Sequence, residues 1–411
     1  MLRIKKEEFT LDKIINYFIL LQIISIGFSM ALSSISLGAW VVLWGFKIYK
    51  EKDFLSFRFF FKEYKYFLLS FGIYIIVDTL SRIFAYFPED ALTGLKRYLL
   101  IICFFSNPTV IKSKSDILRN LLIIAAVFSI LSCIEIVKFA LTLSENLKTT
   151  SFSEIRIDYF SYPITAGEIK MLILMAIFPF LLSKNKYKVK KIYLIIILIP
   201  ILVSLFLTQS RNVYLGVLAA LIIYGIFVNW RFLVSFILFL CLLWIVTPNS
   251  GKDRVRSILD FNHPSNKSRI VMWEVGIKVY KDFPLLGTGD NEITNVYRMY
   301  KNPESHGEGS HFHSNPVMIL ATTGTTGALF YLLIWTTIFY YTIRDYRRAK
   351  NTFDKEIVIG IIIAMISFHI SGIFEWNFGD WEVVTLLYYL ISIVFTLKFI
   401  NYKNNIINGK K

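Results

Sequence analysis

The sequence predicts an all-α polytopic membrane protein with about twelve transmembrane helices and one large outer loop that contains short helices. Hydrophobic residues make up 55% of the 411 residues and charged residues only 18%, whereas charged residues form about a quarter of a typical soluble domain. Apolar runs long enough to cross a bilayer recur along the whole chain. Positive charge concentrates in alternate connecting segments. A helical bundle follows, because irregular backbone cannot lie unpaired in lipid.

The apolar runs give the positions of the predicted spans. A helix needs roughly 17 to 25 residues to cross about 30 Å of hydrocarbon. The first run starts at Ile14, is soon followed by a second and lacks a small-residue cleavage site, so we expect a first span there and no cleavable signal peptide. The predicted spans are approximately 14–30, 32–47, 66–84, 95–107, 117–140, 166–183, 192–207, 212–229, 232–247, 317–342, 357–374 and 383–399.

The formal net charge of +16 is compatible with nucleic-acid binding, but its distribution favours a membrane protein. The opposite short loops are sparse in cations or acidic, as in Pro88–Asp90 and Glu375–Asp380. By the positive-inside rule both termini are cytoplasmic, the number of spans is even, and no nucleic-acid partner is expected. The cations gather at 3–13, 47–65, 112–119, 184–191, 344–355 and 398–411.

This topology places four segments on the outer face. They are a short loop at Pro88, a middle loop over Ser144–Thr165, the large loop Pro248–Asn315 and the turn Glu375–Trp381. We therefore divide the chain into a first set of helices (1–247), the large loop (248–316), and the last helices with the tail (317–411).

The large loop carries two local signals. Ile270, Trp273 and Ile277 recur at helical spacing, which predicts an amphipathic helix over Lys267–Asp282. The segment Gly287–Asn291 then predicts a tight turn, because two glycines bracket a small residue. Its Gly-x-Gly pattern is weak evidence for phosphate binding, since no third glycine opens a helix.

Arg211 is the first candidate for chemistry. It lies in Gln-Ser-Arg-Asn, where the seventh predicted helix ends outside and the eighth begins. One interpretation is an interfacial arginine whose charge reaches toward water. The other is an oriented side chain, because Gln209, Ser210 and Asn212 surround it with hydrogen-bonding groups in a turn too short to be a free loop.

Arg269 is the second candidate, at the start of the predicted loop helix. It precedes Trp273 by four residues, so the two share a helix face. An exposed cation stacked on the indole is one interpretation. A phosphate ligand is the other, because the helix N-terminus and the arginine fork both favour that anion.

His313 is the third candidate, just before the tenth predicted helix. Histidine is a natural general base near neutral pH. A metal site is the alternative, with His311 two residues away and Glu304 or Glu308 as further ligands, but this spacing leaves the remaining donors unspecified. The role of His306 is left open.

Several catalytic motifs are absent from the sequence: a phosphate-binding loop, an Asp-x-Asp site for nucleotide sugars, His-Glu-x-x-His and a nucleophile elbow. Neither ATP nor a nucleotide sugar is therefore the expected energy source. An outward-facing enzyme would need an activated substrate delivered within the membrane.

These residues resemble the bacterial O-antigen ligases, which share a superfamily with O-antigen polymerases and protein O-oligosaccharyltransferases. The ligase signature is a histidine, then Asn, Ser or Gln, nine residues, a glycine, two residues, and Gly, Thr or Tyr. In this chain it runs from His313 through Gly324 to Gly327. Arg211 matches the family's arginine at an outer turn, and Arg269 matches its second arginine, ahead of a tryptophan.

The resemblance implies a GT-C-like fold and a metal-independent, cofactor-free, inverting glycosyltransferase in the bacterial inner membrane, with its active site on the periplasmic face. Its donor would be a glycan on undecaprenyl pyrophosphate and its acceptor a sugar hydroxyl of the lipid A core, both among membrane lipids. His313 would act as general base, and Arg211 and Arg269 would bind the pyrophosphate.

Further candidates lie near the outer ends of the helices. Glu375 and Asp380, on the last outer turn, are candidates for orienting His313 or binding acceptor sugar. Four cations are candidates for the lipid headgroup, with ordinary interfacial placement as the alternative: Arg82, Lys96, Arg97 and Lys170.

Two alternative functions remain. A polymerase would use the same donor with a lipid-linked glycan as acceptor, and only the histidine signature favours the ligase. A transporter for the lipid-linked glycan would have internal repeats and discontinuous helices around a midplane site. The sequence predicts neither feature.

Overall fold

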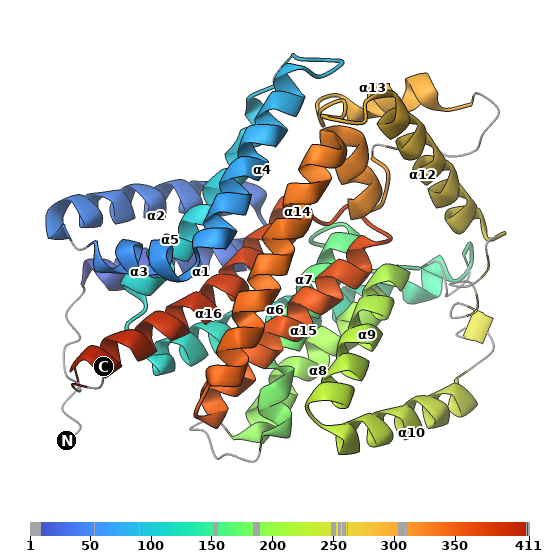
Figure 1. Cartoon of the computed structure of the whole chain (residues 1–411). Helices are drawn as coiled ribbons and strands as arrows, with labels where there is room; N and C mark the ends of the chain where they lie inside the picture. The colour runs from blue at the N-terminus through green and yellow to red at the C-terminus, as the bar shows by residue number, and fades with distance from the viewer. Residues whose placement is uncertain are drawn as a thin grey trace.

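The computed structural model describes residues 10–52, 54–89, 91–150, 155–183, 190–247, 252–253, 256, 260, 262–302, 309, 311–407 and 409. Within these residues the chain forms helices and turns and contains no strand (Figure 1). The helices are α1 Leu11–Ser25, α2 Met30–Glu51, α3 Leu55–Glu63, α4 Lys65–Ile83, η1 Thr93–Ile102, α5 Cys103–Val110, α6 Lys114–Asn146, α7 Pro163–Leu182, α8 Lys191–Leu207, α9 Arg211–Phe227, α10 Trp230–Val246, α12 Pro264–Asp282, α13 Ile293–Tyr300, α14 Asn315–Arg348, α15 Thr352–Gly372 and α16 Trp381–Ile407.

Each predicted span overlaps one of these helices, except that 95–107 is divided between η1 and α5. Among the described residues, six helices are long and apolar enough to cross a membrane: α2, α4, α6, α7, α14 and α16. Shorter apolar helices are α8, α9 and α10. The all-helical, polytopic membrane class is therefore confirmed, whereas the count of twelve spans and the GT-C-like arrangement stay predictions.

Segments that the charge pattern assigns to the same face contact one another at the same end of the bundle. At one end Lys114 pairs with Asp354 at 2.7 Å, and Arg344 pairs with Glu63 at 2.7 Å. At the other end the Thr165 hydroxyl donates to Asp380 at 2.6 Å. We call the second end the loop end, because α12 and α13 also lie there (Figure 1).

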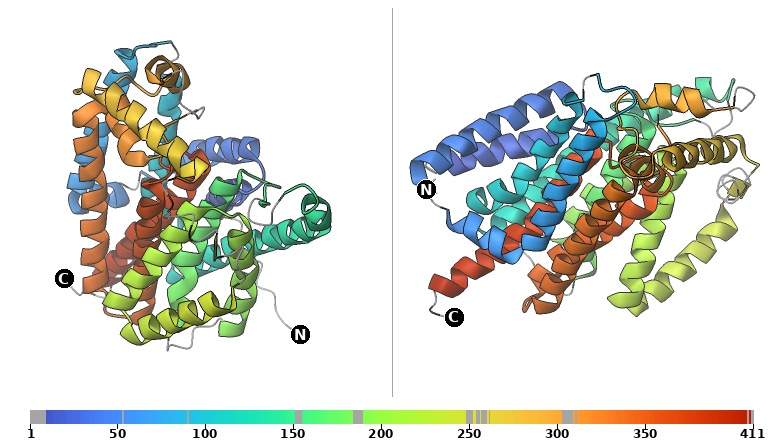
Figure 2. Two further views of the ribbon diagram at one scale, coloured as in Figure 1. Left: turned by 90° about the vertical axis from the view of Figure 1, so that its right-hand side faces the viewer. Right: turned by 45° about the horizontal axis from the view of Figure 1, so that its top comes forward.

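The predicted loop helix is confirmed as α12, although its buried face differs from the expected one. Met272, Val275 and Val279 are buried, whereas Ile270 and Trp273 are only partly so. The three buried side chains belong to a small core with Phe312 and other residues at the start of α14. Figure 2 shows α12 extending across the loop end of the bundle, where it contacts α14. The adjoining helix α13 agrees with the expectation of short helices in the large loop, although its position was not predicted.

Helix α14 is interrupted at Gly324, whose φ of 63° and ψ of −167° are not helical. The segment Pro284–Gly289 of the large loop fills this interruption. Its backbone N–H groups at Thr288 and Gly289 donate to the carbonyls of Ala321 and Thr322 at 3.0 and 2.9 Å. In return, the N–H groups of 325 and 326 donate to the carbonyls of 284 and 285 at 2.8 and 3.3 Å.

The two backbone segments approach so closely that neither Gly324 nor Gly287 has room for a side chain. A Cβ on Gly324 would lie 2.4 Å from the Leu285 carbonyl carbon, and one on Gly287, whose φ is +66°, would lie 2.3 Å from the Thr322 carbonyl carbon. The tight turn predicted at Gly287–Asn291 thus packs against the break in α14. The expectation of uninterrupted helices was wrong at Gly324, because sequence periodicity does not show a break that distant backbone fills.

Candidate active site

A pocket of about 300 Å³ lies at the loop end of the bundle. Arg211, Arg269 and His313 all line it, so the structure brings together the three residues singled out from the sequence. Arg156, from the predicted middle loop, lines the pocket with them. The other lining residues are Ile164, Gln209, Ser210, Asn212, Ser265, Ser268 and Met272.

Four helices begin at this pocket. Ile164 is the second residue of α7, Arg211 the first of α9 and Ser265 the second of α12, and His313 lies two residues before α14. A helix N-terminus carries roughly half a positive charge, because its first N–H groups lack partners within the helix. Four such ends around one pocket favour an anionic ligand.

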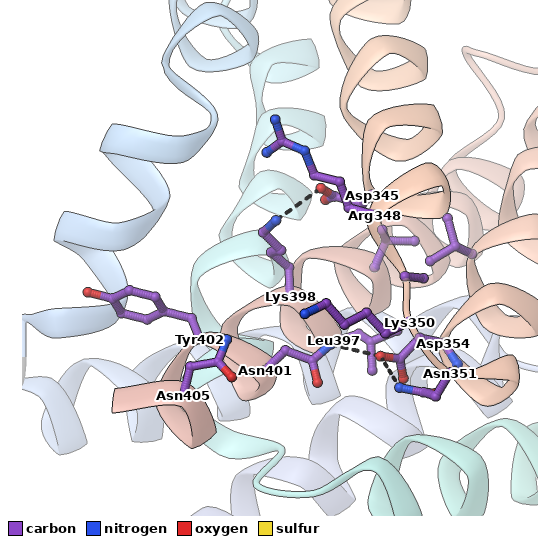
Figure 3. A pocket seen from close by; sticks show the side chains of 13 residues that line it. Asp345, Arg348, Lys350, Asn351, Asp354, Leu397, Lys398, Asn401, Tyr402 and Asn405 are labelled. Carbon is purple, nitrogen blue, oxygen red and sulfur yellow. Dashed lines mark hydrogen bonds and ion pairs between the residues drawn. The ribbon is translucent and has the colours of Figure 1, made fainter. Parts of the chain in front are cut away.

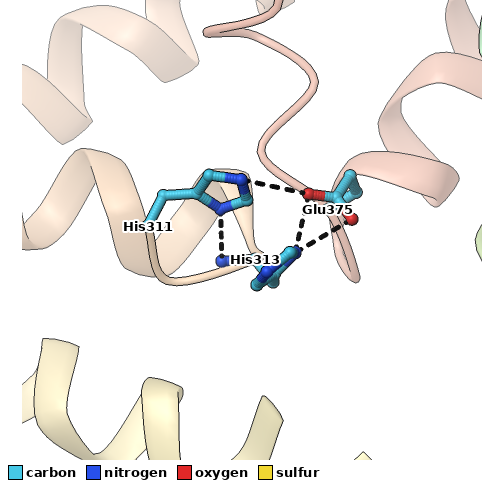
Figure 4. A group of neighbouring side chains, drawn as sticks. All are labelled: His311, His313 and Glu375. Carbon is cyan, nitrogen blue, oxygen red and sulfur yellow. Dashed lines mark hydrogen bonds and ion pairs between the residues drawn. The ribbon is translucent and has the colours of Figure 1, made fainter. Parts of the chain in front are cut away.

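His313 is held by a carboxylate. Its Nδ1 lies 2.8 and 3.0 Å from the two carboxylate oxygens of Glu375, on the turn between α15 and α16 (Figure 4). Burial alone would raise the pKa of Glu375, but the hydrogen bond and charge of His313, with His311 and Arg269, hold that pKa below its usual range. An ionised Glu375 requires a proton on Nδ1 of His313, which leaves Nε2 as the proton acceptor.

His311 supports the same arrangement from the other side. The backbone N–H of His313 donates to Nδ1 of His311 at 3.2 Å, and Nε2 of His311 lies 3.7 Å from Glu375 (Figure 4). Burial, together with His313 and Arg269, lowers the pKa of His311 to about 4. His311 is therefore neutral near pH 7, with Nδ1 accepting a hydrogen bond and its proton on Nε2.

The arginines give the pocket its positive charge. Arg269 lies 3.6 Å from Glu375, and its side chain is only 16% exposed, so the exposed cation stacked on Trp273 is not what the structure shows. Burial and the charge of Arg156 lower the pKa of Arg269, against the opposing effect of Glu375. Arg211 is buried and donates to the Ser265 hydroxyl at 2.9 Å. Three arginines thus line the pocket, and Arg269 among them is paired with Glu375.

The backbone at the pocket is strained. Four non-glycine residues in the described part of the chain have left-handed backbone angles, and two of these, Gln209 at φ 53° and His313 at φ 44°, line the pocket. Such conformations cost of order 1–3 kcal/mol each and concentrate at functional sites. Here they turn the chain immediately before Arg211 and before α14.

Comparison with known proteins bears on this pocket directly. Residues 194–332 match the model of a family described as O-antigen ligase. This is the family expected from the sequence, and the match supports that expectation. The match covers less than half of the chain but includes Arg211, Arg269 and His313. No curated protein matches the chain.

The structure explains the two glycines of the O-antigen ligase signature. Gly324 forms the break in α14 that receives the loop backbone at Leu285. Gly327 lies against Thr323, whose hydroxyl would be 2.0 Å from an added Cβ. The histidine of the signature therefore belongs to the pocket, while Gly324 receives the large loop beside it and Gly327 leaves room for the Thr323 side chain.

The further cationic candidates lie outside the pocket lining. Arg82 and Arg97 bind Asp78 at 2.8 and 3.1 Å and both also contact Asp290, so they fasten the turn after Gly289 to α4 and η1. Lys96 is exposed on η1.

Lys170 and Asp380 are likewise engaged elsewhere. Lys170 pairs with buried Glu135 at 2.7 Å, inside the bundle. Asp380 accepts the backbone N–H groups of Glu382 and Val383 at 3.1 and 3.3 Å, so it caps α16.

Sequence reasoning missed two residues. Arg156 lies between buried Ile155 and Ile157, and the alternation of apolar and charged residues was the available signal. Glu168, one turn into α7, is buried beneath the pocket and binds segments from distant parts of the chain. No local pattern indicates such contacts.

The alternative metal site gains one ligand but also a competing charge. His311, His313 and Glu375 offer donor atoms within 4.8 Å of one another, so Glu375 supplies a third donor that sequence spacing could not place. The Arg269 guanidinium beside Glu375 opposes a second cation there. Glu304, His306 and Glu308 lie outside the described residues.

A larger pocket, of about 410 Å³, lies at the opposite end of the bundle, around Asp345, Asp354 and Lys398 (Figure 3). Its two carboxylates are already paired, Asp345 with Lys398 at 3.4 Å and Asp354 with Lys114 at 2.7 Å. It contains no histidine. The smaller pocket combines a candidate base with excess positive charge, so we assign the chemistry there.

Proposed function

We propose that the protein is an inverting, metal-independent O-antigen ligase that transfers a glycan from undecaprenyl pyrophosphate to a sugar hydroxyl of the lipid A core. The carrying observation is that one pocket joins the Glu375-bound His313 to three arginines. The match of residues 194–332 to the O-antigen ligase family supports the reaction class.

The arginines and the helix N-termini suit the leaving group. When the bond between the sugar C1 and the pyrophosphate oxygen breaks, that oxygen keeps the electron pair and its negative charge increases. Arg211 and Arg269, with Arg156, would stabilise this charge, each charged hydrogen bond contributing roughly 1.5–3 kcal/mol. Because undecaprenyl pyrophosphate leaves as an anion, no proton donor is required.

His313 suits the acceptor. The sugar hydroxyl attacks C1 from the face opposite the pyrophosphate, which inverts the configuration, and its proton passes to Nε2 of His313. Glu375 would hold the ring in the required tautomer and stabilise the resulting imidazolium. A positioned base of this kind contributes roughly 10²–10⁴-fold to the rate.

The location follows from charge. The loop end is opposite the end where Lys114, Arg344 and Lys398 gather. By the positive-inside rule, the cationic end and both termini would be cytoplasmic and the active site periplasmic, in the bacterial inner membrane.

The test uses His313→Ala. Purified protein is mixed with undecaprenyl-pyrophosphate-linked glycan and rough lipopolysaccharide, and modified lipid A core is followed on a gel. We expect transfer to fall by roughly 10²–10⁴-fold, with donor lipid binding largely retained, because the base is lost and the arginines remain. Substantial transfer by the variant would exclude His313 as the base.

The same assay separates the alternatives. The control His369→Phe removes a partly buried histidine that packs on Trp335, away from the pocket, and should keep its activity. Lengthening of the lipid-linked glycan by the wild-type protein would instead identify a polymerase. Inhibition by a chelator would show that a metal is required, with His311, His313 and Glu375 as its candidate ligands.

A further inference from the structure

A buried polar cluster lies directly beneath the pocket, centred on Glu168 of α7. The side chain of Glu168 is 1% exposed, and its Oε1 accepts three hydrogen bonds: from Ser371 Oγ at 2.6 Å, Asn212 Nδ2 at 3.0 Å and Asn377 Nδ2 at 3.3 Å. Glu168 does not line the pocket. Loss of this acceptor oxygen would remove one hydrogen bond from each of the three buried donors. Such losses cost free energy in a low-dielectric interior.

Each donor lies next to a residue of the candidate site. Asn212 follows Arg211 in α9, while Ser371 is the second-last residue of α15, four residues before Glu375. Asn377 follows Glu375 by two residues. One carboxylate oxygen thus joins the arginine-bearing helix to the turn that carries the partner of His313.

Asn377 connects the segment that carries His313 to the polar cluster. Asn315, two residues after His313, donates from Nδ2 to Asn377 Oδ1 at 2.6 Å, and its own Oδ1 accepts the backbone N–H of Phe378 at 3.1 Å. Space is limited as well, because a Cβ on Gly372 would lie 2.2 Å from Asn315 Nδ2. Small shifts at Glu168 would therefore be transmitted to His313 and Glu375.

We propose that Glu168 is a positioning residue, which fixes Arg211, Glu375 and His313 relative to one another without touching substrate. This inference rests on the proposed glycan transfer for its functional consequence. The proposal predicts that a Glu168 variant has a different defect from an Arg211 or a His313 variant, because the anion-binding and the proton-accepting groups would be displaced together.

The test compares Glu168→Ala with Glu168→Gln. We expect Glu168→Ala to lower kcat and raise KM for the lipid-linked donor together, with kcat/KM falling about 10²-fold, as for a misplacement near 1 Å. Glu168→Gln keeps an acceptor oxygen at Oε1, so it should retain most of the activity. His313→Ala, in contrast, should lower kcat with little change in KM.

A second measurement does not depend on catalysis. Hydrogen–deuterium exchange over residues 209–212, 311–316 and 373–380 should be faster in Glu168→Ala than in wild type and unchanged in Glu168→Gln. The matched control is Glu135→Gln, another buried glutamate, which binds Ser204 and Lys170 within the bundle. It should leave exchange in the three segments and KM unchanged.

Two results would overturn the proposal: wild-type exchange in Glu168→Ala, or a Glu168→Gln variant as defective as Glu168→Ala. If Glu168→Ala does not fold, Asn377→Ala, which removes the shared link, must show the same combined kcat and KM defect. If wild-type protein transfers no glycan, the proposed function fails, and exchange alone decides the positioning role.

Discussion

At the scale of single residues, the pocket depends on how its groups share the negative charge of Glu375. His313 takes the closest position, at 2.8 Å, while Arg269 and His311 lie at 3.6 and 3.7 Å. An anionic ligand would add a second negative charge among the arginines. Glu375 can then remain with the histidine, which keeps the base and the anion site electrostatically separate.

The depressed pKa of His311 predicts a loss of stability in acid. Between about pH 6.5 and pH 4 the unfolded chain binds a proton at His311 and the folded chain does not, so stability falls as the pH decreases through this window. The charged or titratable groups facing it are His313, Glu375 and Arg269. We expect the Tm of purified protein to decrease from pH 6.5 to 4, and to decrease less in His311→Asn. An equal decrease in Tm with pH for wild type and His311→Asn would contradict the role of His311 in this acid effect.

The sequence was informative about residues whose type and local setting are unusual. Arg211 begins α9, Arg269 is the sixth residue of α12 and His313 precedes α14, so short-range patterns pointed to all three. Glu375 was a candidate only through its place on an outer turn. Its contact with His313 joins residues 62 positions apart, and such a pairing depends on how α14, α15 and α16 pack.

At the scale of helices, the broken helix α14 and the inserted loop make the clearest prediction. Gly324→Ala places a Cβ against the Leu285 carbonyl and forces alanine into φ 63°, so we expect a loss of about 1–3 kcal/mol or more in stability. The Tm of the purified variant measures this effect.

Gly45→Ala is the matched control. Gly45 lies within α2, and nothing lies within 4 Å of an added Cβ there. Alanine should raise helix propensity by about 1 kcal/mol at such a position, so stability should be equal or higher. Equal Tm changes in the two variants would mean that the loop is not docked into α14.

Helix positions were predictable because apolar runs of sufficient length have few alternatives in a membrane. The buried face of α12 was not predictable. Met272 and Ile270 are both apolar, and the packing of α12 against α14 decides which of them is buried. Helix α3 also escaped prediction, because its Phe-rich sequence is interrupted by charges.

At the scale of the whole molecule, the separation of charge between the two ends predicts its orientation. In a cysteine-free background, Lys96→Cys on η1 should react with a membrane-impermeant maleimide applied from the periplasmic side. Lys350→Cys, between α14 and α15, should react only after the inner membrane is permeabilised, because the proposed orientation places the cationic end in the cytoplasm. Both positions are exposed in the structure. The reverse labelling pattern would place the candidate site in the cytoplasm.

The backbone exchange between Pro284–Gly289 and α14 also sets an order for biogenesis. Hydrogen-bonding groups left unpaired in lipid cost several kcal/mol each, so α14 cannot be inserted as a stable, independent span. Its missing partners precede it in the chain and, in the proposed orientation, would already have crossed the bilayer when α14 enters. Translocation of the loop and integration of α14 are then a single assembly step, and the pocket beside His313 forms as that step is completed.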